Sequence, residues 1–188
     1  MKRLFLLLFL LLAWPVWAAN TPKTESERLK HAGELYFAYK PEEALKEYLA
    51  LSKETNNRQA FLNAAFIAME QNNPKLAVDV AVAALRLYPQ DREVLETAAE
   101  AYLADGQYQG AEKLLSLIPE DKTRAGFFHI NLARAQIGLN EPSLAKYNLK
   151  MAARAGTHPA LAHYLLGLLY EDGKDYKNAA KAFEAATA

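Results

Sequence analysis

Residues 166–186 read LGLLYEDGKDYKNAAKAFEAA, and one alanine of this stretch, Ala179, recurs at a fixed distance along the chain. Its counterparts are Ala145, Ala111 and Ala77, which gives a constant step of about 34 residues. A constant step of this length is typical of proteins built as a stack of copies of one small unit. The step therefore predicts a repeat architecture, and it favours a binding role over a catalytic one.

Other positions keep the same step and show what each unit contains. Four residues after these alanines lie Ala81, Leu115, Leu149 and Phe183, and seven residues after them lie Ala84, Ile118, Ala152 and Ala186. Twelve residues before them lie Ala65, Ala99, Ala133 and Gly167. Offsets of four and seven place side chains on one face of an α-helix. Segments 71–74, 104–107, 138–142 and 172–175 carry Gly, Asn or Pro and predict turns. Each unit therefore holds two helices, and small residues let their backbones approach closely.

These columns resemble those of the tetratricopeptide repeat (TPR) family. The last unit matches the family's pattern at Leu166-Gly167, Tyr170, Gly173, Tyr176, Ala179, Phe183 and Ala186. The third unit keeps Tyr102, Gly106, Tyr108 and Ala111, and a first unit is matched by Gly33, Tyr36, Ala44 and Tyr48 with a turn about one residue shorter.

The resemblance implies an all-α fold, a right-handed α-solenoid of antiparallel helix pairs with about five repeats. The solenoid is expected over residues 26–188, with repeats at about 26–57, 58–91, 92–125, 126–159 and 160–188. No low-complexity or Pro-rich linker divides this part of the chain, which indicates one domain.

The N-terminus carries the pattern of a secretory signal peptide. Met1-Lys2-Arg3 supplies positive charge, residues 4–13 are apolar, and Pro15 and small residues follow. Small residues at Val16 and Ala18 favour cleavage after Ala18, so residues 1–18 are expected to be removed and residues 19–25 to form a flexible lead-in. Cleavage after Ala19 is the second choice.

The signal peptide predicts a periplasmic or secreted protein without stable membrane insertion after cleavage. The alternative is an uncleaved signal that anchors the protein in the inner membrane. Against it, the apolar run is shorter than the roughly 20 residues of a spanning helix, and Pro15 interrupts it. The absence of cysteine excludes a lipoprotein anchor, disulfides and thiol catalysis.

No catalytic, cofactor-binding or metal-binding pattern is present, so the chain is expected not to be an enzyme. His158 and His163 do not have the spacing of a helical zinc motif, and His129 and His163 are separated by the repeat step, which indicates a shared structural column. Without Lys2 and Arg3 the chain has 20 basic and 22 acidic residues and no basic stripe, which argues against nucleic acid as a partner.

In proteins of the TPR family, the first helix of each unit lines the concave surface. The resemblance therefore implies a partner-binding groove formed by Leu62, Phe66, Met69, Glu96, Glu100, Phe127, Ile130, Arg134, Ile137, Tyr164 and Leu168, with Lys30, Glu34 and Phe37 in the first unit. The apolar members of the second, fourth and fifth units would form an exposed patch, as interaction sites commonly do. Alternatively, tight superhelical winding buries some of them against neighbouring repeats. The family's lysine-based clamp for C-terminal carboxylates is not expected, because its lysines are missing.

The last helix predicts a second interface. Ala179, Ala182, Phe183 and Ala186 form an apolar stripe, and the sequence holds no polar helix after it to cover that stripe. Either the chain is the N-terminal part of a longer protein, or this end face mediates homo-oligomer formation.

The resulting prediction is a protein–protein interaction scaffold of the bacterial cell envelope that binds a segment of another envelope protein in its groove. The alternative is an accessory module of an envelope polysaccharide-export or cell-wall enzyme complex. Both tryptophans, Trp14 and Trp17, lie in the signal peptide, so the mature chain lacks the side chain best suited to stack on sugars. This weakens the alternative.

Overall fold

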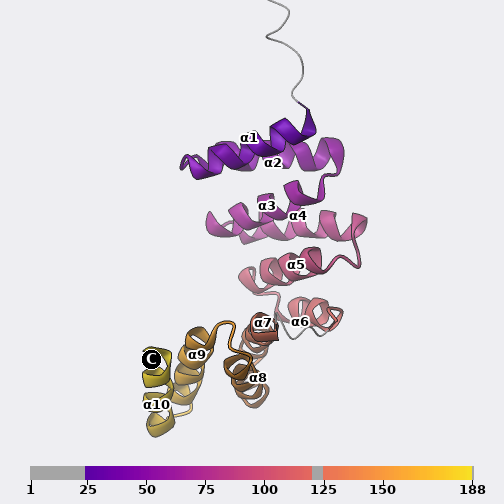
Figure 1. Cartoon of the computed structure of the whole chain (residues 1–188). Coiled ribbons are helices and arrows are strands. Elements are labelled where there is room, and N and C mark those ends of the chain that lie inside the picture. The colour runs from indigo at the N-terminus through magenta and orange to yellow at the C-terminus, as the bar shows by residue number, and fades with distance from the viewer. Residues whose placement is uncertain (1–23, 120–124, 188) are drawn as a thin grey trace, which may run out of the picture.

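The computed structural model describes residues 24–119 and 125–187, and these residues form ten α-helices without strands. The helices are α1 (Glu25–Phe37), α2 (Pro41–Thr55), α3 (Arg58–Glu70), α4 (Pro74–Leu87), α5 (Arg92–Ala104), α6 (Tyr108–Ser116), α7 (Ala125–Gly138), α8 (Pro142–Ala155), α9 (Pro159–Asp172) and α10 (Tyr176–Thr187). Consecutive helices pair as antiparallel hairpins, and the hairpins stack in chain order (Figure 1). The prediction of an all-α solenoid of about five repeats is confirmed.

One turn geometry joins the two helices of every pair. The residue in the left-handed region is Tyr39, Asn72, Gly106, Asn140 or Lys174, with φ between 55° and 74°. The following residue donates its N–H to the carbonyl five residues earlier, at 2.8–3.0 Å, which is the Schellman pattern that ends a helix. These positions keep the repeat step of the sequence, except that the first interval is one residue shorter. The short turn predicted in the first unit is wrong: residues 38–40 join α1 to α2 just as residues 71–73 join α3 to α4, and the one-residue difference lies after this turn, before α3.

The turn also corrects one assignment made from the family pattern. In the last unit, the left-handed residue that corresponds to Gly106 is Lys174, whereas Gly173 has φ −76° and sits one residue earlier. In the first unit, the small buried residue that corresponds to Ala65 is Ala32 rather than Gly33, because the first repeat step is one residue shorter than the others.

Small residues lie where the helices of a pair cross. Ala65, Ala99 and Ala133 are at most 1 % exposed, and Gly167 in the same column is buried. A Cβ atom added at Gly167 would fall on the ring of Phe183 of α10. The core is therefore a series of clusters along the stack, each between neighbouring helices, as expected of a solenoid.

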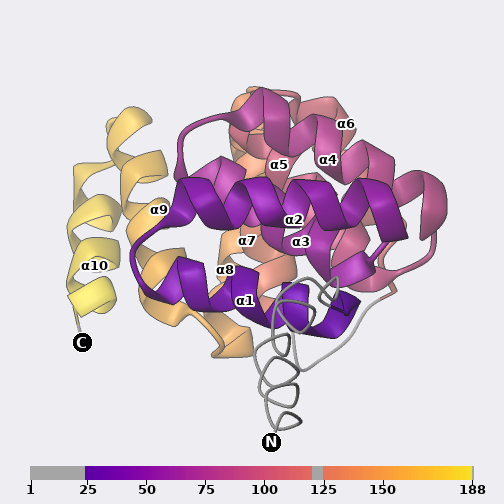
Figure 2. The same ribbon diagram turned by 90° about the horizontal axis from the view of Figure 1, so that it is seen from above.

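The stack is not straight. The last two pairs, α7–α8 and α9–α10, are turned relative to the first two (Figure 1), and the view from above separates α9 and α10 from the other helices (Figure 2). Within the described ranges, no helix has both the length and the apolar character needed to cross a bilayer.

The predicted exposed stripe on the last helix is wrong. Ala179 and Ala182 are buried, Phe183 packs against Gly167 and lies 5.9 Å from the Tyr164 ring, and Ala186 is partly buried. Residues three, four and seven apart share one helical face, and α10 packs that face on α9. The outward side of α10 carries exposed polar residues: Lys177, Asn178, Lys181 and Glu184.

The predicted signal peptide, residues 1–18, lies outside the described residues. The end of the predicted lead-in, by contrast, belongs to the first helix. Thr24 caps α1 in a capping box: its hydroxyl accepts from the backbone N–H of Glu27, and the Glu27 carboxylate accepts from the backbone N–H of Thr24. The Glu25 carboxylate then accepts a hydrogen bond from the Asn57 side chain, which ties α1 to the start of α3.

Candidate partner-binding face

The first helix of each pair contributes side chains to one surface, called here the first-helix face. It comprises Tyr36 and Phe37 of α1, Phe66, Met69 and Glu70 of α3, Glu93, Glu96 and Glu100 of α5, Phe127, Arg134 and Ile137 of α7, and Leu161, Tyr164 and Leu168 of α9. The nearly constant repeat step brings equivalent positions of neighbouring repeats onto this face.

Most of the predicted groove residues reach the surface. Among the large apolar ones, Phe66 is 47 % exposed, Ile137 40 %, Tyr164 49 % and Leu168 40 %. Arg134 is exposed, while Met69, Glu100 and Phe127 are partly buried. Whether these residues bind a partner stays a prediction.

Three predicted groove residues are buried instead. Ile130 is 2 % exposed and packs with Ala152 and Ala162, so its predicted place in the exposed patch is wrong. Leu62 and Glu96 are each 8 % exposed. The alternative, in which tight winding buries some of the predicted groove residues, thus holds for Leu62, Glu96 and Ile130. These three residues occupy equivalent positions in successive repeats and are covered by the neighbouring helices.

An open hollow of about 280 Å³ lies on this face across α3, α5 and α7. Leu62 and Phe127 form its two apolar ends, and Glu93, Glu96, Thr97 and Glu100 line it between them. The hollow therefore combines apolar walls with an acidic centre. A shallower hollow of about 530 Å³ lies elsewhere, along α2 and the end of α3, between Glu42, Lys46, Leu49, Lys53 and Gln71.

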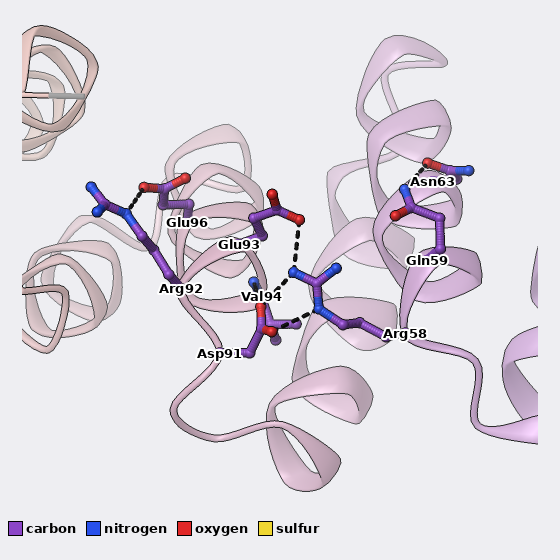
Figure 3. A network of polar contacts seen from close by, with 8 residues as sticks. All are labelled: Arg58, Gln59, Asn63, Asp91, Arg92, Glu93, Val94 and Glu96. Carbon is purple, nitrogen blue, oxygen red and sulfur yellow. Dashed lines mark hydrogen bonds and ion pairs between the residues drawn. The ribbon is translucent and has the colours of Figure 1, made fainter. Parts of the chain in front are cut away.

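Arg58, the first residue of α3, reaches across to the start of α5 (Figure 3). Its guanidinium donates two hydrogen bonds to Asp91, at 2.7 and 2.8 Å, and one to Glu93 at 2.7 Å. Asp91 is also the N-cap of α5 and accepts from the Val94 N–H at 3.0 Å. The hydrogen bonds from Arg58 hold the pKa of the Asp91 carboxyl below its usual value, and the carboxylates raise the pKa of Arg58.

The rest of the acidic centre is also held in place. Arg92 donates to Glu96, one turn further along α5, at 2.9 Å (Figure 3). In α7, the buried Asn131 donates weakly to Glu100 at 3.5 Å and accepts from Arg134 at 3.1 Å. Arg58 of α3, Arg92 of α5 itself and Asn131 of α7 therefore hold the carboxylates of the acidic centre in a defined geometry.

An aromatic cluster occupies the α1–α3 end of the face. The Tyr36 ring lies edge-on to Phe37 and Phe66, with centroids 5.7 and 6.2 Å apart, and its hydroxyl donates to Glu70 at 2.7 Å. That hydrogen bond raises the pKa of the Tyr36 hydroxyl. The sequence prediction missed Tyr36 and placed Lys30 and Glu34 in the groove.

The shorter first step explains that miss. Counted with this step, Tyr36 and Phe37 correspond to Met69 and Glu70. Lys30 and Glu34 instead form an exposed ion pair on α1, with Lys30 Nζ 3.7 Å from Glu34 Oε1. The Arg58–Asp91 pair was missed as well, although, like the Glu25–Asn57 pair, it joins residues almost one full repeat apart.

The histidines form no metal centre in the part of the chain that the structure describes, where no group of three His, Asp or Glu side chains could hold an ion. His129 contacts the buried Asn148 at 2.8 Å through Nδ1, and Asn148 donates to Gln136 at 2.8 Å. Asn148 Oδ1 is the acceptor in this chain of hydrogen bonds, so Nδ1 of His129 carries the proton. His129 thus has a structural contact within the α7–α8 pair.

The chain is similar to known repeat proteins in its sequence pattern and in its fold. The tetratricopeptide repeat family model matches residues 68–125. No protein with a curated description matches the sequence.

Solved structures similar to this chain include MamA, residues 41 to the end, from Desulfovibrio magneticus RS-1, at 18 % identity and a TM-score of 0.76 over 89 % of this chain and 96 % of that one. PilF of Pseudomonas aeruginosa gives 15 % identity and a TM-score of 0.71, over 87 % and 75 % of the two chains. A chain of the Cut9–Hcn1 hetero-tetramer of the APC/C has 16 % sequence identity and a TM-score of 0.70, over 86 % of this chain and 33 % of that one. At these identities the likeness concerns the fold. The family model and the fold shared with these structures support the tetratricopeptide repeat family for this chain.

Proposed function

We propose that this chain is a non-enzymatic scaffold of the cell envelope and that its first-helix face binds a segment of a partner protein. TPR-like structural neighbours suggest an interaction scaffold, and one of them is solved as part of the Cut9–Hcn1 hetero-tetramer. The envelope location is proposed from the sequence of residues 1–18, and the groove from the arrangement of exposed side chains.

One observation carries the proposal. Phe66, Ile137, Tyr164 and Leu168 remain 40–49 % exposed on one face, although the fold buries alanines and leucines efficiently between its helices. Fully burying such a side chain contributes roughly 1.5–3 kcal/mol, so covering the remaining exposed half contributes about 1 kcal/mol per residue. Several such residues on one face favour association with a partner surface.

Exposed apolar side chains also occur on the second helices, and they provide a matched control. Leu144 and Tyr147 of α8 and Tyr176 of α10 are 51–66 % exposed. They lie outside the first-helix face and the hollow. Singly exposed apolar residues are common on protein surfaces and do not by themselves mark an interface.

The binding proposal is tested by purifying the tagged protein with its partners from the cells that make it. We expect the variant Phe66→Ser/Phe127→Ser/Tyr164→Ser to lose partners that the wild type retains. The control variant Leu144→Ser/Tyr147→Ser/Tyr176→Ser should keep them. Far-UV circular dichroism verifies that both variants are helical. If the first variant is helical and retains the same partners, the first-helix face is not the binding surface.

The envelope location is tested separately. Residues 1–25 fused to a reporter enzyme that is active only outside the cytoplasm should give activity, and deletion of residues 4–13 should remove it. Mass spectrometry of the exported full chain should show a new N-terminus at Ala19. An intact N-terminus on a membrane-bound protein would instead support the uncleaved anchor. A cytoplasmic product would contradict export.

A further inference from the structure

Every charged residue of α8 is basic. Lys146, Lys150 and Arg154 follow one another at intervals of four residues, and the helix holds no aspartate or glutamate after its N-cap, Glu141. Residues four apart lie on one side of a helix, so these three form a row along α8. Lys150 and Arg154 are exposed, while the ammonium group of Lys146 lies over the Tyr170 ring of α9, 4.9 Å from its centroid.

A row of apolar side chains runs beside this basic row. Leu144, Tyr147 and Met151 are spaced three and four residues apart, which places them along one strip of the helix. Leu144 is 51 % exposed, Tyr147 is 61 % exposed, and Met151 is partly buried. Because α8 packs on α7 and on α9, its remaining side carries both rows.

The two ends of the stack differ in charge. Residues 24–119 contain ten basic and fifteen acidic residues, whereas residues 125–187 contain seven basic and five acidic ones. The even charge balance of the whole chain conceals this difference. An anionic surface therefore attracts the end of the molecule that carries α8 and repels the other end.

We propose that the exposed side of α8 binds the surface of an anionic lipid bilayer. The apolar row enters the layer where acyl chains meet headgroups, and the basic row contacts the lipid phosphates. Tyr147 suits this boundary, because a tyrosine has an apolar ring and a polar hydroxyl. Lysine and arginine suit it as well, because their stems pack beside apolar groups while their charges reach the phosphates. This contact is peripheral, and it uses a different surface from the first-helix face.

The shape of the surface favours lipid over a peptide. The hollows described above lie on α2, α3, α5 and α7, whereas both rows of α8 stand on one side of a single helix. A peptide segment is commonly held in a groove, while a bilayer contacts an exposed helix side along its whole length. The second helix of the next pair, α10, has a similar exposed composition, with Tyr176, Lys177 and Lys181 beside Glu184.

Vesicle binding tests the proposal with the mature protein, which lacks residues 1–18 and the apolar run that would bind lipid by itself. Vesicles of phosphatidylcholine and phosphatidylglycerol in equal parts should co-sediment the protein, and pure phosphatidylcholine should bind it at least about tenfold more weakly. Binding should fall as salt rises, because counterions screen the attraction. Equal binding to both kinds of vesicle would overturn the proposal. Binding to neither would also overturn it and would favour an acidic protein segment as the occupant.

Matched variants locate the contact. Lys150→Glu/Arg154→Glu should weaken binding to the anionic vesicles at least about tenfold. Arg86→Glu/Lys113→Glu makes the same change of charge at exposed positions of α4 and α6 and should leave binding nearly unchanged. Arg86, Lys113 and Arg154 all lie in the last turn of a helix, so helix stability is affected alike, and circular dichroism verifies the fold. Equal loss in both variants would overturn the assignment to α8.

A fluorescent side chain tests the depth of the apolar row. Trp14 and Trp17 lie in residues 1–18, so Tyr147→Trp gives the mature protein a single tryptophan. Anionic vesicles should shift its emission to shorter wavelengths, and lipids brominated on their acyl chains should quench it. Tyr39→Trp, at a 95 % exposed position of the α1–α2 turn, should show neither effect. Unshifted emission from Tyr147→Trp in vesicle-bound protein, or equal quenching at both positions, would overturn the placement of α8 at the bilayer.

Discussion

At the scale of the residue, the left-handed turn position carries a measurable strain. Gly106 adopts φ 74° without a Cβ atom, whereas Lys174 adopts φ 59° with one. A side chain in this conformation costs about 1 kcal/mol. We expect Lys174→Gly to stabilise the protein by up to about 1 kcal/mol and Gly106→Ala to destabilise it by about 1 kcal/mol, measured as shifts in urea denaturation.

Gly173→Ala is the control for this comparison. Gly173 lies next to Lys174 but has a negative φ, and an added Cβ would be 3.4 Å from the Leu169 carbonyl oxygen. The effect of this change should therefore be smaller than that of Gly106→Ala. A larger effect at Gly173 would mean that the family pattern, rather than the backbone angles, identifies the turn residue.

Close helix contact at Gly167 gives a second residue-scale prediction. An added Cβ would meet the Phe183 ring, so Gly167→Ala should destabilise the protein by about 1–3 kcal/mol. In a Phe183→Leu background the penalty should be smaller, because the ring is gone. A double-mutant cycle in urea measures this coupling. Strict additivity of the two changes would show that the contact is not the cause.

The sequence predicted these columns because a fixed step repeats them in several units. It could not give the left-handed residue in the last unit, because Gly173 and Lys174 are adjacent and only backbone angles distinguish them. It also placed Ile130 on the surface. Ile130 is indeed the residue of its repeat that corresponds to Leu62 and Glu96. Its burial, however, depends on how closely α7 packs on Ala152 and Ala162, which no local sequence pattern encodes.

At the scale of the element, Asp91 both caps α5 and binds Arg58 of α3. Asp91→Asn separates these roles, since asparagine is an equally good N-cap but lacks the charge. We expect the variant to lose about 1 kcal/mol of stability at pH 7, a modest value because the pair is about one-third exposed. Urea denaturation of both proteins measures the difference.

The pH dependence of that difference has a definite sign. The folded state lowers the pKa of Asp91, so the stabilisation is present above the ordinary carboxyl pKa of about 4 and is lost as pH falls through the lower folded pKa. Wild type and Asp91→Asn should therefore converge below about pH 4. A difference that stays constant down to pH 2 would assign the effect to something other than the Asp91 charge.

The last helix shows why an apolar stripe in a sequence does not by itself define an interface. Ala179, Ala182, Phe183 and Ala186 were predicted to be exposed because the sequence holds no helix after them. They instead form the face that α10 packs on α9, and the outward side of α10 is polar. An amphipathic helix has one apolar face, and in this fold the preceding helix uses it.

At the scale of the whole molecule, the repeats bring dispersed residues of the sequence onto one surface. Residues from Tyr36 to Leu168 become neighbours on the first-helix face only because the solenoid stacks their helices. The family resemblance predicted which helices form this face, and exposure of Phe66, Ile137, Tyr164 and Leu168 agrees with that prediction. Of the ion pairs in the acidic centre, those of Arg58 with Asp91 and Glu93 join two repeats and were not predictable from one unit, whereas Arg92–Glu96 is an i,i+4 pair within α5.

Site-specific photo-crosslinking in cells tests the central claim most directly. A photoreactive amino acid is placed singly at Phe66 and Tyr164 on the first-helix face, and at Tyr147 and Lys181 on exposed surfaces of α8 and α10. The account predicts crosslinks to one and the same partner polypeptide at the first two positions and to none at the other two. Crosslinks to that partner only at Tyr147 and Lys181, or equally at all four positions, would contradict it.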